Sequence, residues 1–204
     1  MTDEHSRPLN EADVDRDPFA QYGRWFAEAQ GSSRFPEAVA VATASASGRP
    51  SVRMVLLKGF DHRGFVFFTN YTSDKGRQLE ANPQAALLSH WEQLGRQVRV
   101  EGPVIRVEPA ESDEYFASRP RGSQLGAHAS AQSRPVADRA ALEAAVAEVT
   151  ATYEGAEVPR PPSWGGYRLV PERFEFWQNR EDRLHDRLVY ERSGNAWTLT
   201  RIQP

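Results

Sequence analysis

The sequence predicts an α+β fold whose centre is an antiparallel β-sheet or barrel. Short strand-like stretches rich in Val, Phe and Leu occur before residue 108 and again after residue 163, with helical patterns between the two blocks. Turn signals separate neighbouring stretches by only a few residues, which favours antiparallel hairpins over parallel strands joined by helices. A length of 204 residues and a hydrophobic share of 39% fit a single globular domain.

The first element is a helix that begins at Asp17-Pro18. Residues 1–16 show no apolar periodicity, so we expect a flexible N-terminal arm ahead of one domain formed by residues 17–204. Asp can cap the free N–H groups of a helix, and Pro fits its first position. Phe19, Tyr22 and Phe26 follow at helical spacing and predict one buried face. Gly31 and the two serines after it should end the helix.

Three strands and a short helix are expected next. Residues 38–45 and 51–60 alternate around a Gly-Arg-Pro turn, and residues 65–70 follow the turn at 61–64. Ser73 can cap a helix that runs through Glu80 and stops at Asn82-Pro83.

The second half of the chain alternates in the same way. Strands are expected at 85–91 and 96–107, with Gly102-Pro103 marking a bulge or bend. A helix at 109–118 precedes a basic loop, Arg-Pro-Arg-Gly-Ser-Gln, and a second helix spans 138–153. The final strands are expected at 166–170, 173–178, 183–192 and 196–202, the last two joined by Ser193-Gly194-Asn195.

Composition excludes several classes of function. The chain has no cysteine, which removes disulfides, thiol nucleophiles and Cys-based metal sites, and its five His residues form no local metal motif, so we expect no metal. The net charge of −3 predicts no nucleic-acid partner, and no apolar run is long enough to span a membrane. The polar, acidic N-terminus lacks a signal-peptide pattern, so a cytoplasmic protein is expected.

One candidate anion site lies where a strand ends and a helix begins. Thr69, Ser73 and Lys75 place hydroxyl groups and an ammonium at a helix N-terminus, which favours bound anions. Arg53 and Lys58 flank the apolar stretch Met-Val-Leu-Leu nearby in the sequence. The alternative interpretation is a solvated turn with a capping serine.

A second candidate site joins Tyr115, Arg119 and Ser123, which are spaced four residues apart. Tyr115 and Arg119 share a helix face, and Ser123 is expected in the loop beyond. A phenol, a guanidinium and a hydroxyl group suit a phosphate monoester. The alternative is a helix end followed by a charged loop.

A third candidate site is the stretch from Arg183 to Arg187. Strand alternation predicts that Arg183, His185 and Arg187 share one face. Two Arg residues around a His are costly unless an anion or an electron-rich ring offsets their charge. The alternative is an exposed strand face, with Trp177 as an ordinary core residue.

These motifs together resemble the pyridoxine/pyridoxamine 5′-phosphate oxidase family. The resemblance covers residues 17–204 in order and rests on Arg-Met-Val-Leu-Leu-Lys (53–58), Phe-Phe-Thr-Asn (67–70), the stretches at 96–102 and 115–127, Gln132-Ser133, and FEFWQNREDRLHDR at 174–187. It implies a split β-barrel homodimer with FMN sites in the subunit interface.

The family's site residues carry over position by position. For the FMN phosphate the resemblance implies Arg53, Thr69, Lys75, Gln132 and Ser133. For the flavin ring it implies Met54, Val55, Leu56, Leu57, Gln97, Trp177 and Arg187, with Lys58 and Phe68 also in the cofactor site. For the substrate phosphate it implies Lys58, Tyr115, Arg119 and Ser123. Arg183 and His185 would cover the substrate's pyridine ring as the catalytic pair. The 53–58 strand and the Gln132-Ser133 pair would come from different subunits.

The resemblance also implies a reaction. A hydride would pass from C4′ of a small phosphorylated pyridine to the flavin, giving pyridoxal 5′-phosphate, and O2 would reoxidise the flavin to give H2O2. Related alternatives are a phenazine-type flavin oxidase of secondary metabolism and a flavin- or haem-binding split-barrel protein without turnover.

Three features depart from the family pattern. Asp74 stands where a basic residue is common, His128 stands where Trp is usual, and the N-terminal segment that folds over the substrate has no obvious counterpart. An anion at position 74 would weaken binding of the FMN phosphate if its side chain faced that phosphate.

Overall fold

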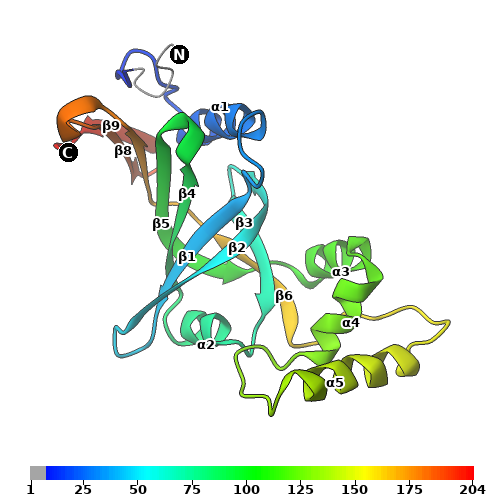
Figure 1. The fold of residues 1–204 in the computed structure, drawn as a ribbon. Helices are drawn as coiled ribbons and strands as arrows, with labels where there is room; N and C mark the ends of the chain where they lie inside the picture. The colour runs from blue at the N-terminus through cyan, green and yellow to red at the C-terminus, as the bar shows by residue number, and fades with distance from the viewer. Residues whose placement is uncertain (1–7) are drawn as a thin grey trace.

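The structure is a computed structural model that describes residues 8–204; residues 1–7 lie outside the described part. Six antiparallel strands form a closed barrel in the order β4-β1-β2-β3-β6-β5, with β4 paired to β5 (Figure 1). The barrel strands are β1 (Ala38–Ala44), β2 (Pro50–Asp61), β3 (Gly64–Asn70), β4 (Gln84–Trp91), β5 (Arg96–Arg106) and β6 (Trp164–Leu169). The predicted α+β class with an antiparallel barrel is confirmed.

A three-stranded extension continues from β5 beyond the barrel. It consists of β7 (Arg173–Gln178), β8 (Asp186–Ser193) and β9 (Ala196–Arg201). Strand β5 belongs to both parts, because Arg96–Glu101 pairs with β7 and Val104–Arg106 pairs with β6. The change of partner falls at Gly102-Pro103, where a side chain on Gly102 would lie 2.1 Å from the carbonyl oxygen of Val170. Glycine is therefore required where the two parts meet.

The helices lie at the two ends of the barrel (Figure 1). They are α1 (Pro18–Gln30), α2 (Asp74–Ala81), α3 (Pro109–Ser118), α4 (Arg121–Ala129) and α5 (Arg139–Thr152), with short 3-10 turns at η2 (Glu92–Leu94) and η3 (Glu181–Arg183). Helix α1 begins as predicted, since the Asp17 side chain accepts a hydrogen bond from the N–H of Phe19 at 3.0 Å. Its Tyr22 packs edge-on to Phe65 in the barrel core, with ring centroids 4.8 Å apart.

Residues 8–16 are packed against the body of the molecule, which differs from the free arm expected there. Leu9 is buried, and its N–H donates to the Asp186 carboxylate at 3.1 Å. Arg201 of β9 donates to both carboxylate oxygens of Glu11 and to the carbonyl of Leu9. These polar contacts depend on residues far away in the sequence, which local composition does not reveal. The remainder of the predicted arm, residues 1–7, lies outside the described residues.

The basic loop expected after α3 is wrong from residue 121 onward. Helix α4 starts at Arg121, so Ser123 lies in its first turn and not in a loop. Leu125 of α4 packs into a small second core with Phe116, Val158 and Trp164. This burial stabilises a helix whose two glycines give it a low intrinsic propensity.

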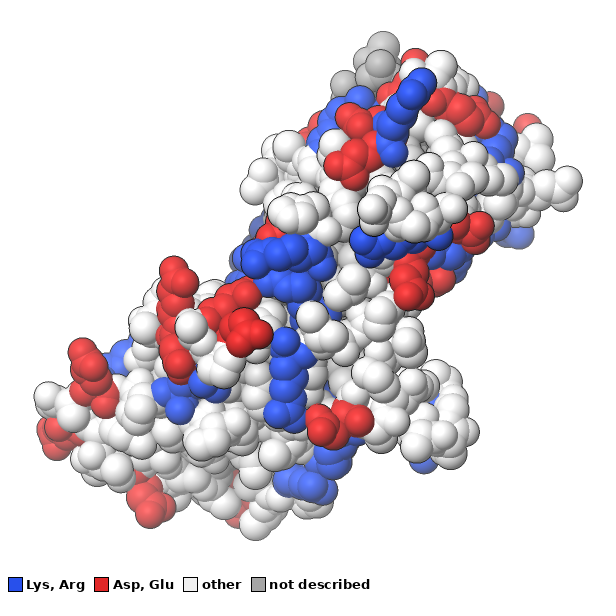
Figure 2. All heavy atoms as spheres, turned by 180° about the vertical axis from the view of Figure 1, so that it is seen from behind, with Lys and Arg blue, Asp and Glu red and all other residues white. Residues whose placement is uncertain are grey.

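The surface carries both signs of charge. On the face shown in Figure 2, Lys and Arg side chains gather in the narrow middle of the molecule, with acidic side chains beside them. Among residues 8–204, no helix is long and apolar enough to cross a membrane.

Candidate active site

One pocket of about 320 Å³ collects most of the residues predicted for the first two sites. It lies between strands β2 and β3 and helices α3 and α4. Its lining residues are Met54, Val55, Leu56, Lys58, Phe68, Thr69, Asn70, Lys75, Tyr115, Arg119, Ala127, Ser130, Gln132 and Trp164. Three of these side chains are cationic, and no Asp or Glu of the described chain lines the pocket. The two candidate sites are therefore one site.

Lys75 is the buried cation of this pocket. Its ammonium donates to the Thr69 hydroxyl at 2.9 Å and to the Gln132 side-chain carbonyl at 3.0 Å, and the residue is 8% exposed. Both partners are neutral. Burial, together with the nearby Arg53 guanidinium, lowers the pKa of Lys75 below that of a free lysine. An ammonium in this position favours an anionic ligand, which would offset its lost hydration.

Arg53, on β2, does not line the pocket but lies near enough to Lys75 to act on its charge. Its hydrogen-bond partners within the described chain are also neutral. Its guanidinium donates to the Thr43 hydroxyl at 2.6 Å, to the Gln78 side-chain carbonyl at 3.2 Å, and to two backbone carbonyls. Burial lowers its pKa. The pair forms a concentration of positive charge at the N-terminus of α2, where Ser73 caps the helix as predicted.

Arg119 supplies a second cation, at the C-terminal end of α3. Its guanidinium lies 4.6 Å from the ring centre of Trp164 and 5.4 Å from that of Phe116. The buried Nη1 atom has no hydrogen-bond partner among the described residues, and burial lowers the pKa of the group. Tyr115 stacks on Phe68 with centroids 4.1 Å apart. This aromatic wall holds a guanidinium with unused donors at the pocket.

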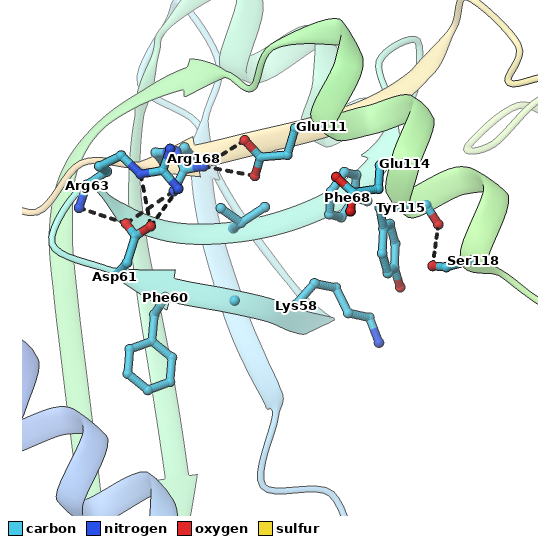
Figure 3. A pocket seen from close by; sticks show the side chains of 12 residues that line it. Lys58, Phe60, Asp61, Arg63, Phe68, Glu111, Glu114, Tyr115, Ser118 and Arg168 are labelled. Atoms are coloured by element: carbon cyan, nitrogen blue, oxygen red, sulfur yellow. Dashed lines mark hydrogen bonds and ion pairs between the residues drawn. The ribbon is translucent and has the colours of Figure 1, made fainter.

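In a neighbouring pocket of about 360 Å³, acidic side chains lie among the cationic ones (Figure 3). There the buried Arg168 donates to both oxygens of Glu111, at 2.8 and 2.9 Å, and lies 3.5 Å from Asp61, which also pairs with Arg63. Its guanidinium is thus neutralised within the chain. Lys58 lies on the border of both pockets and extends toward Tyr115, 5.9 Å from the ring centre. The first pocket, with cations that lack carboxylate partners, is therefore the better candidate for binding a phosphate.

Four of the other predicted residues form a second group on β5 and the sheet extension. Gln97, Trp177 and Arg187 are direct cross-strand neighbours on β5, β7 and β8, so they form one row across the sheet. His185 lies beside this row, with its ring centre 4.5 Å from that of Trp177. The sequence separated these residues by up to 90 positions, and only the strand register brings them together.

The predicted strand alternation from Arg183 to Arg187 is wrong. Residues 181–183 form the turn η3, in which Asp182 and Arg183 have φ values of 55° and 61°, and β8 begins only at Asp186. His185 is positioned instead by the backbone, because the N–H of Arg180 donates to its Nδ1 atom at 3.1 Å. In the neutral ring the proton then sits on Nε2, which is a donor.

The two groups lie in different parts of the chain. Figure 1 shows β8 and β9 at one end of the molecule and α3, α4 and α5 at the other. Gln132, expected from the partner subunit, already contacts Thr69 and Lys75 of its own chain. That part of the interpretation is corrected. Ser123 and Ser133 do not line the pocket.

Two of the departures from the family pattern, Asp74 and His128, lie within the described residues. Asp74 does not line the pocket, pairs with Arg77 and has a side chain 60% exposed. Its charge still acts on the two nearby cations, since it opposes the lowering of the pKa of Arg53 and of Lys75. His128 donates from Nε2 to the carbonyl of Pro159 at 2.7 Å, and its ring packs on Tyr153. Solvent exposure and the pairing with Arg77 screen the charge of Asp74, so the predicted repulsion of a bound phosphate is reduced.

Sequence reasoning missed three contributors to the site. Trp164 forms the surface under Arg119, Gln78 binds Arg53, and Glu175 binds Arg187. Of the three, only Glu175 could have been singled out from the sequence, because a carboxylate between aromatic residues of a strand is unusual and suggests a specific partner. Within residues 8–204, no three acidic or His side chains come together as a metal site.

Two families of known sequences match the chain. A family described as "Pyridoxamine 5′-phosphate oxidase" matches residues 26–153, and one described as "Pyridoxine 5′-phosphate oxidase C-terminal dimerisation region" matches residues 164–204.

Individual relatives agree with these matches. The chain is 58% identical to a pyridoxine/pyridoxamine 5′-phosphate oxidase of Rubrobacter xylanophilus over 96% of this chain and 91% of the relative. It is 57% identical to one of Paraburkholderia phymatum, over 96% and 93%. Among solved structures, PhzG of Burkholderia lata in complex with tetrahydrophenazine-1-carboxylic acid superposes with a TM-score of 0.91 at 39% identity, covering 98% of this chain and all of that one.

Proposed function

Because the chain belongs to the pyridoxamine 5′-phosphate oxidase family, we propose that it is a homodimeric, FMN-dependent oxidase of pyridoxine or pyridoxamine 5′-phosphate. The proposed product is pyridoxal 5′-phosphate, with O2 as the electron acceptor. Membership of this family makes the chain an oxidoreductase, and we propose its substrate and its cofactor.

The observation that carries the proposal is that three cations without a carboxylate partner in the described chain, Lys75, Arg119 and Lys58, line one pocket. Arg53 does not line the pocket but lies near enough to Lys75 to lower its pKa, so Lys75 with Arg53 forms one cationic group and Arg119 with Lys58 forms the other. An FMN and a phosphorylated substrate bring two phosphate groups, one for each cationic group. A chain that bound only an uncharged substrate would leave the guanidinium of Arg119 desolvated without compensation.

Residues in and beside the pocket would hold the two phosphates. Lys75 and Arg53, with the hydroxyl of Thr69, fit the FMN phosphate, and Gln132 would reorient its amide toward it. Arg119, Lys58 and the Tyr115 hydroxyl fit the substrate phosphate, since a forked guanidinium donates two parallel hydrogen bonds to phosphate oxygens. When bound, FMN supplies the redox chemistry by accepting a hydride.

The site residues on β5 and the sheet extension would come from the partner subunit. Gln97, Trp177 and Arg187 would line the flavin ring, with Arg183 and His185 over the substrate ring. The family match of residues 164–204 to a dimerisation region supports this arrangement. His185, fixed through Nδ1, presents an Nε2–H donor, so its role is to bind and orient the substrate rather than to remove a proton.

A phenazine-type oxidation is the second candidate, favoured by the 0.91 TM-score to PhzG. Arg119 fits either candidate, because its guanidinium can pair with the carboxylate of tetrahydrophenazine-1-carboxylic acid as well as with a phosphate, so the substrate has to be tested directly.

The direct test is an anaerobic titration of the purified holoprotein. We expect pyridoxine 5′-phosphate to bleach the flavin absorption, and unphosphorylated pyridoxine at the same concentration to leave most of it oxidised. Equal bleaching by both compounds would remove the case for a phosphate-binding site. If neither pyridoxine 5′-phosphate nor pyridoxamine 5′-phosphate bleached the flavin, the proposed function would be overturned.

A further inference from the structure

A buried carboxylate, that of Glu175, lies beside the site residues Gln97, Trp177 and Arg187. Glu175 is on β7, two residues before Trp177 and on the same face of the strand, and it is 5% exposed. Its neighbours in the strand, Phe174 and Phe176, point to the opposite face and are fully buried.

Three guanidinium groups surround this carboxylate. Oε1 of Glu175 lies 2.8 Å from Nε of Arg187 and 2.7 Å from its Nη2, so the contact is bidentate on the arginine side. Oε2 accepts from Arg99 at 2.6 Å and lies 3.5 Å from Arg173. The carbonyl of Gln203, next to the C-terminus, accepts from Nη1 of Arg187 at 2.9 Å.

These contacts fix the Arg187 side chain on all three of its nitrogens. A guanidinium has five N–H bonds, and the two left over, one on each terminal nitrogen, are the ones that can reach a ligand. Their direction is set by Glu175 and the Gln203 carbonyl. Removing Glu175 would leave the Gln203 carbonyl as the single described anchor of the guanidinium.

Stability alone does not explain such a cluster. Buried ion pairs often contribute little net stability compared with well-packed apolar residues, because desolvation opposes their attraction. A buried carboxylate that grips one arginine from behind does, however, restrict that arginine to one orientation.

We propose that Glu175 is a positioning residue, which orients Arg187 for contact with the flavin ring of FMN. The proposal rests on the proposed function, since it assumes that FMN is the ligand of Arg187. It makes Glu175 act on FMN only through Arg187.

The chain offers a matched control in Glu101. This carboxylate lies in the same cluster, 2.6 Å from Nε of Arg99 and 3.5 Å from Arg173, but the described contacts include none between it and Arg187. Glu101→Gln therefore disturbs the cluster without removing the anchor of Arg187.

The test is a double-mutant cycle on FMN affinity, measured by quenching of flavin fluorescence in apoprotein. The variants are Glu175→Gln, Arg187→Ala, the double variant and Glu101→Gln. We expect each of the first two to raise the Kd on the order of tenfold, and the double variant to bind no more weakly than Arg187→Ala alone. Glu101→Gln should stay within about threefold of the parent.

Several outcomes would overturn the inference. One is a Kd that rises as much from Glu175→Gln in the Arg187→Ala background as in the parent. Another is an unchanged Kd with only a lowered Tm, which would show a purely structural role. If Glu175→Gln does not fold, Glu175→Asp replaces it in the same cycle, because it keeps the charge but withdraws from Arg187. A parent protein that does not bind FMN at all would instead overturn the proposed function, and this inference with it.

Discussion

The cationic side chains in and beside the pocket differ from several other basic residues of the described chain because no carboxylate is hydrogen-bonded to them. Arg168 and Arg187 are buried or half-buried with carboxylates in contact, whereas Lys75, Arg53 and Arg119 have neutral partners or none. Desolvation of an unpaired cation costs free energy, so such residues are typical of sites that bind anions. The ammonium of Lys75 and the guanidinium of Arg119 are therefore the two groups most suited to hold a bound anion.

The lowered pKa of Lys75 predicts how FMN affinity changes with pH. The folded apoprotein loses the Lys75 proton below the ordinary lysine pKa of about 10.4. Apoprotein stability should therefore rise with pH between the folded and unfolded pKa values, because the unfolded chain binds the proton more tightly there. A bound phosphate requires the charged form. We thus expect the FMN Kd to rise at alkaline pH through the folded pKa.

Two variants make this measurement specific. Lys75→Arg keeps a charge at all pH values used, so its Kd should rise less steeply with pH than that of the parent. Asp74→Arg should change the Kd by less than about threefold, since the Asp74 side chain is exposed and faces Arg77. A tenfold tighter Kd in Asp74→Arg would place that side chain at the phosphate, contrary to the structure.

Arg119→Ala should weaken substrate binding without slowing the chemical step. The guanidinium would contact the substrate phosphate both before and during hydride transfer, so its loss should mainly raise KM. A charge-assisted contact of roughly 1.5–3 kcal/mol corresponds to a rise on the order of 10- to 150-fold. His185→Ala, next to the reacting ring, should instead lower the rate of flavin reduction at saturating substrate.

Anaerobic stopped-flow measurements on both variants separate these effects. Arg121→Ala is the control, because Arg121 is two residues from Arg119 but donates to the carbonyls of Tyr153 and Ala156 outside the pocket. If Arg119→Ala slows saturated reduction as much as His185→Ala does while KM stays unchanged, the assigned roles are wrong.

At the scale of helices and strands, the sequence predicted most of the order but not the exceptions. Hairpin spacing, the cap at Asp17 and the cap at Ser73 are local signals, and the structure confirms the elements that they predict. The turn at Asp182-Arg183 was missed, because positive φ values in non-glycine residues leave no local pattern. The start of α4 was missed because tertiary burial of Leu125 overrides a weak propensity. The row of Gln97, Trp177 and Arg187 depends on strand register, which one sequence does not reveal.

The contacts of residues 8–16 predict that this segment detaches in acid. Hydrogen bonding from Arg201 lowers the pKa of Glu11 from its usual value to about 2. A carboxyl group with a depressed folded pKa stabilises the folded segment above its unfolded pKa of about 4.3, and that contribution is lost as pH falls toward 2.

Hydrogen exchange followed by mass spectrometry checks this at the level of the segment. Peptides covering residues 9–16 should exchange faster in Glu11→Gln at neutral pH, as they do in the parent in acid, while barrel peptides stay protected. Unchanged protection of 9–16 in Glu11→Gln would show that the Arg201 contacts do not hold the segment.

At the scale of the whole molecule, the chain carries two halves of a site at different ends. The pocket proposed to bind phosphate lies by α3 and α4, and the row of Gln97, Trp177 and Arg187 with His185 lies on β5 and the sheet extension. In a twofold symmetric dimer, each site would combine one half from each subunit, so two equivalent sites form. The account's central claim is that neither subunit contains a complete site.

Mixed dimers test this claim most directly. Lys75→Ala damages the pocket and His185→Ala damages the other half, so each variant alone should be nearly inactive. Co-expressed with different tags and purified as heterodimers, the two should form one intact site from the unchanged halves. We predict about half of the parent activity and one tightly bound FMN per heterodimer at that site. Heterodimers as inactive as the two homodimers would show that each site lies within one subunit, and would contradict the account.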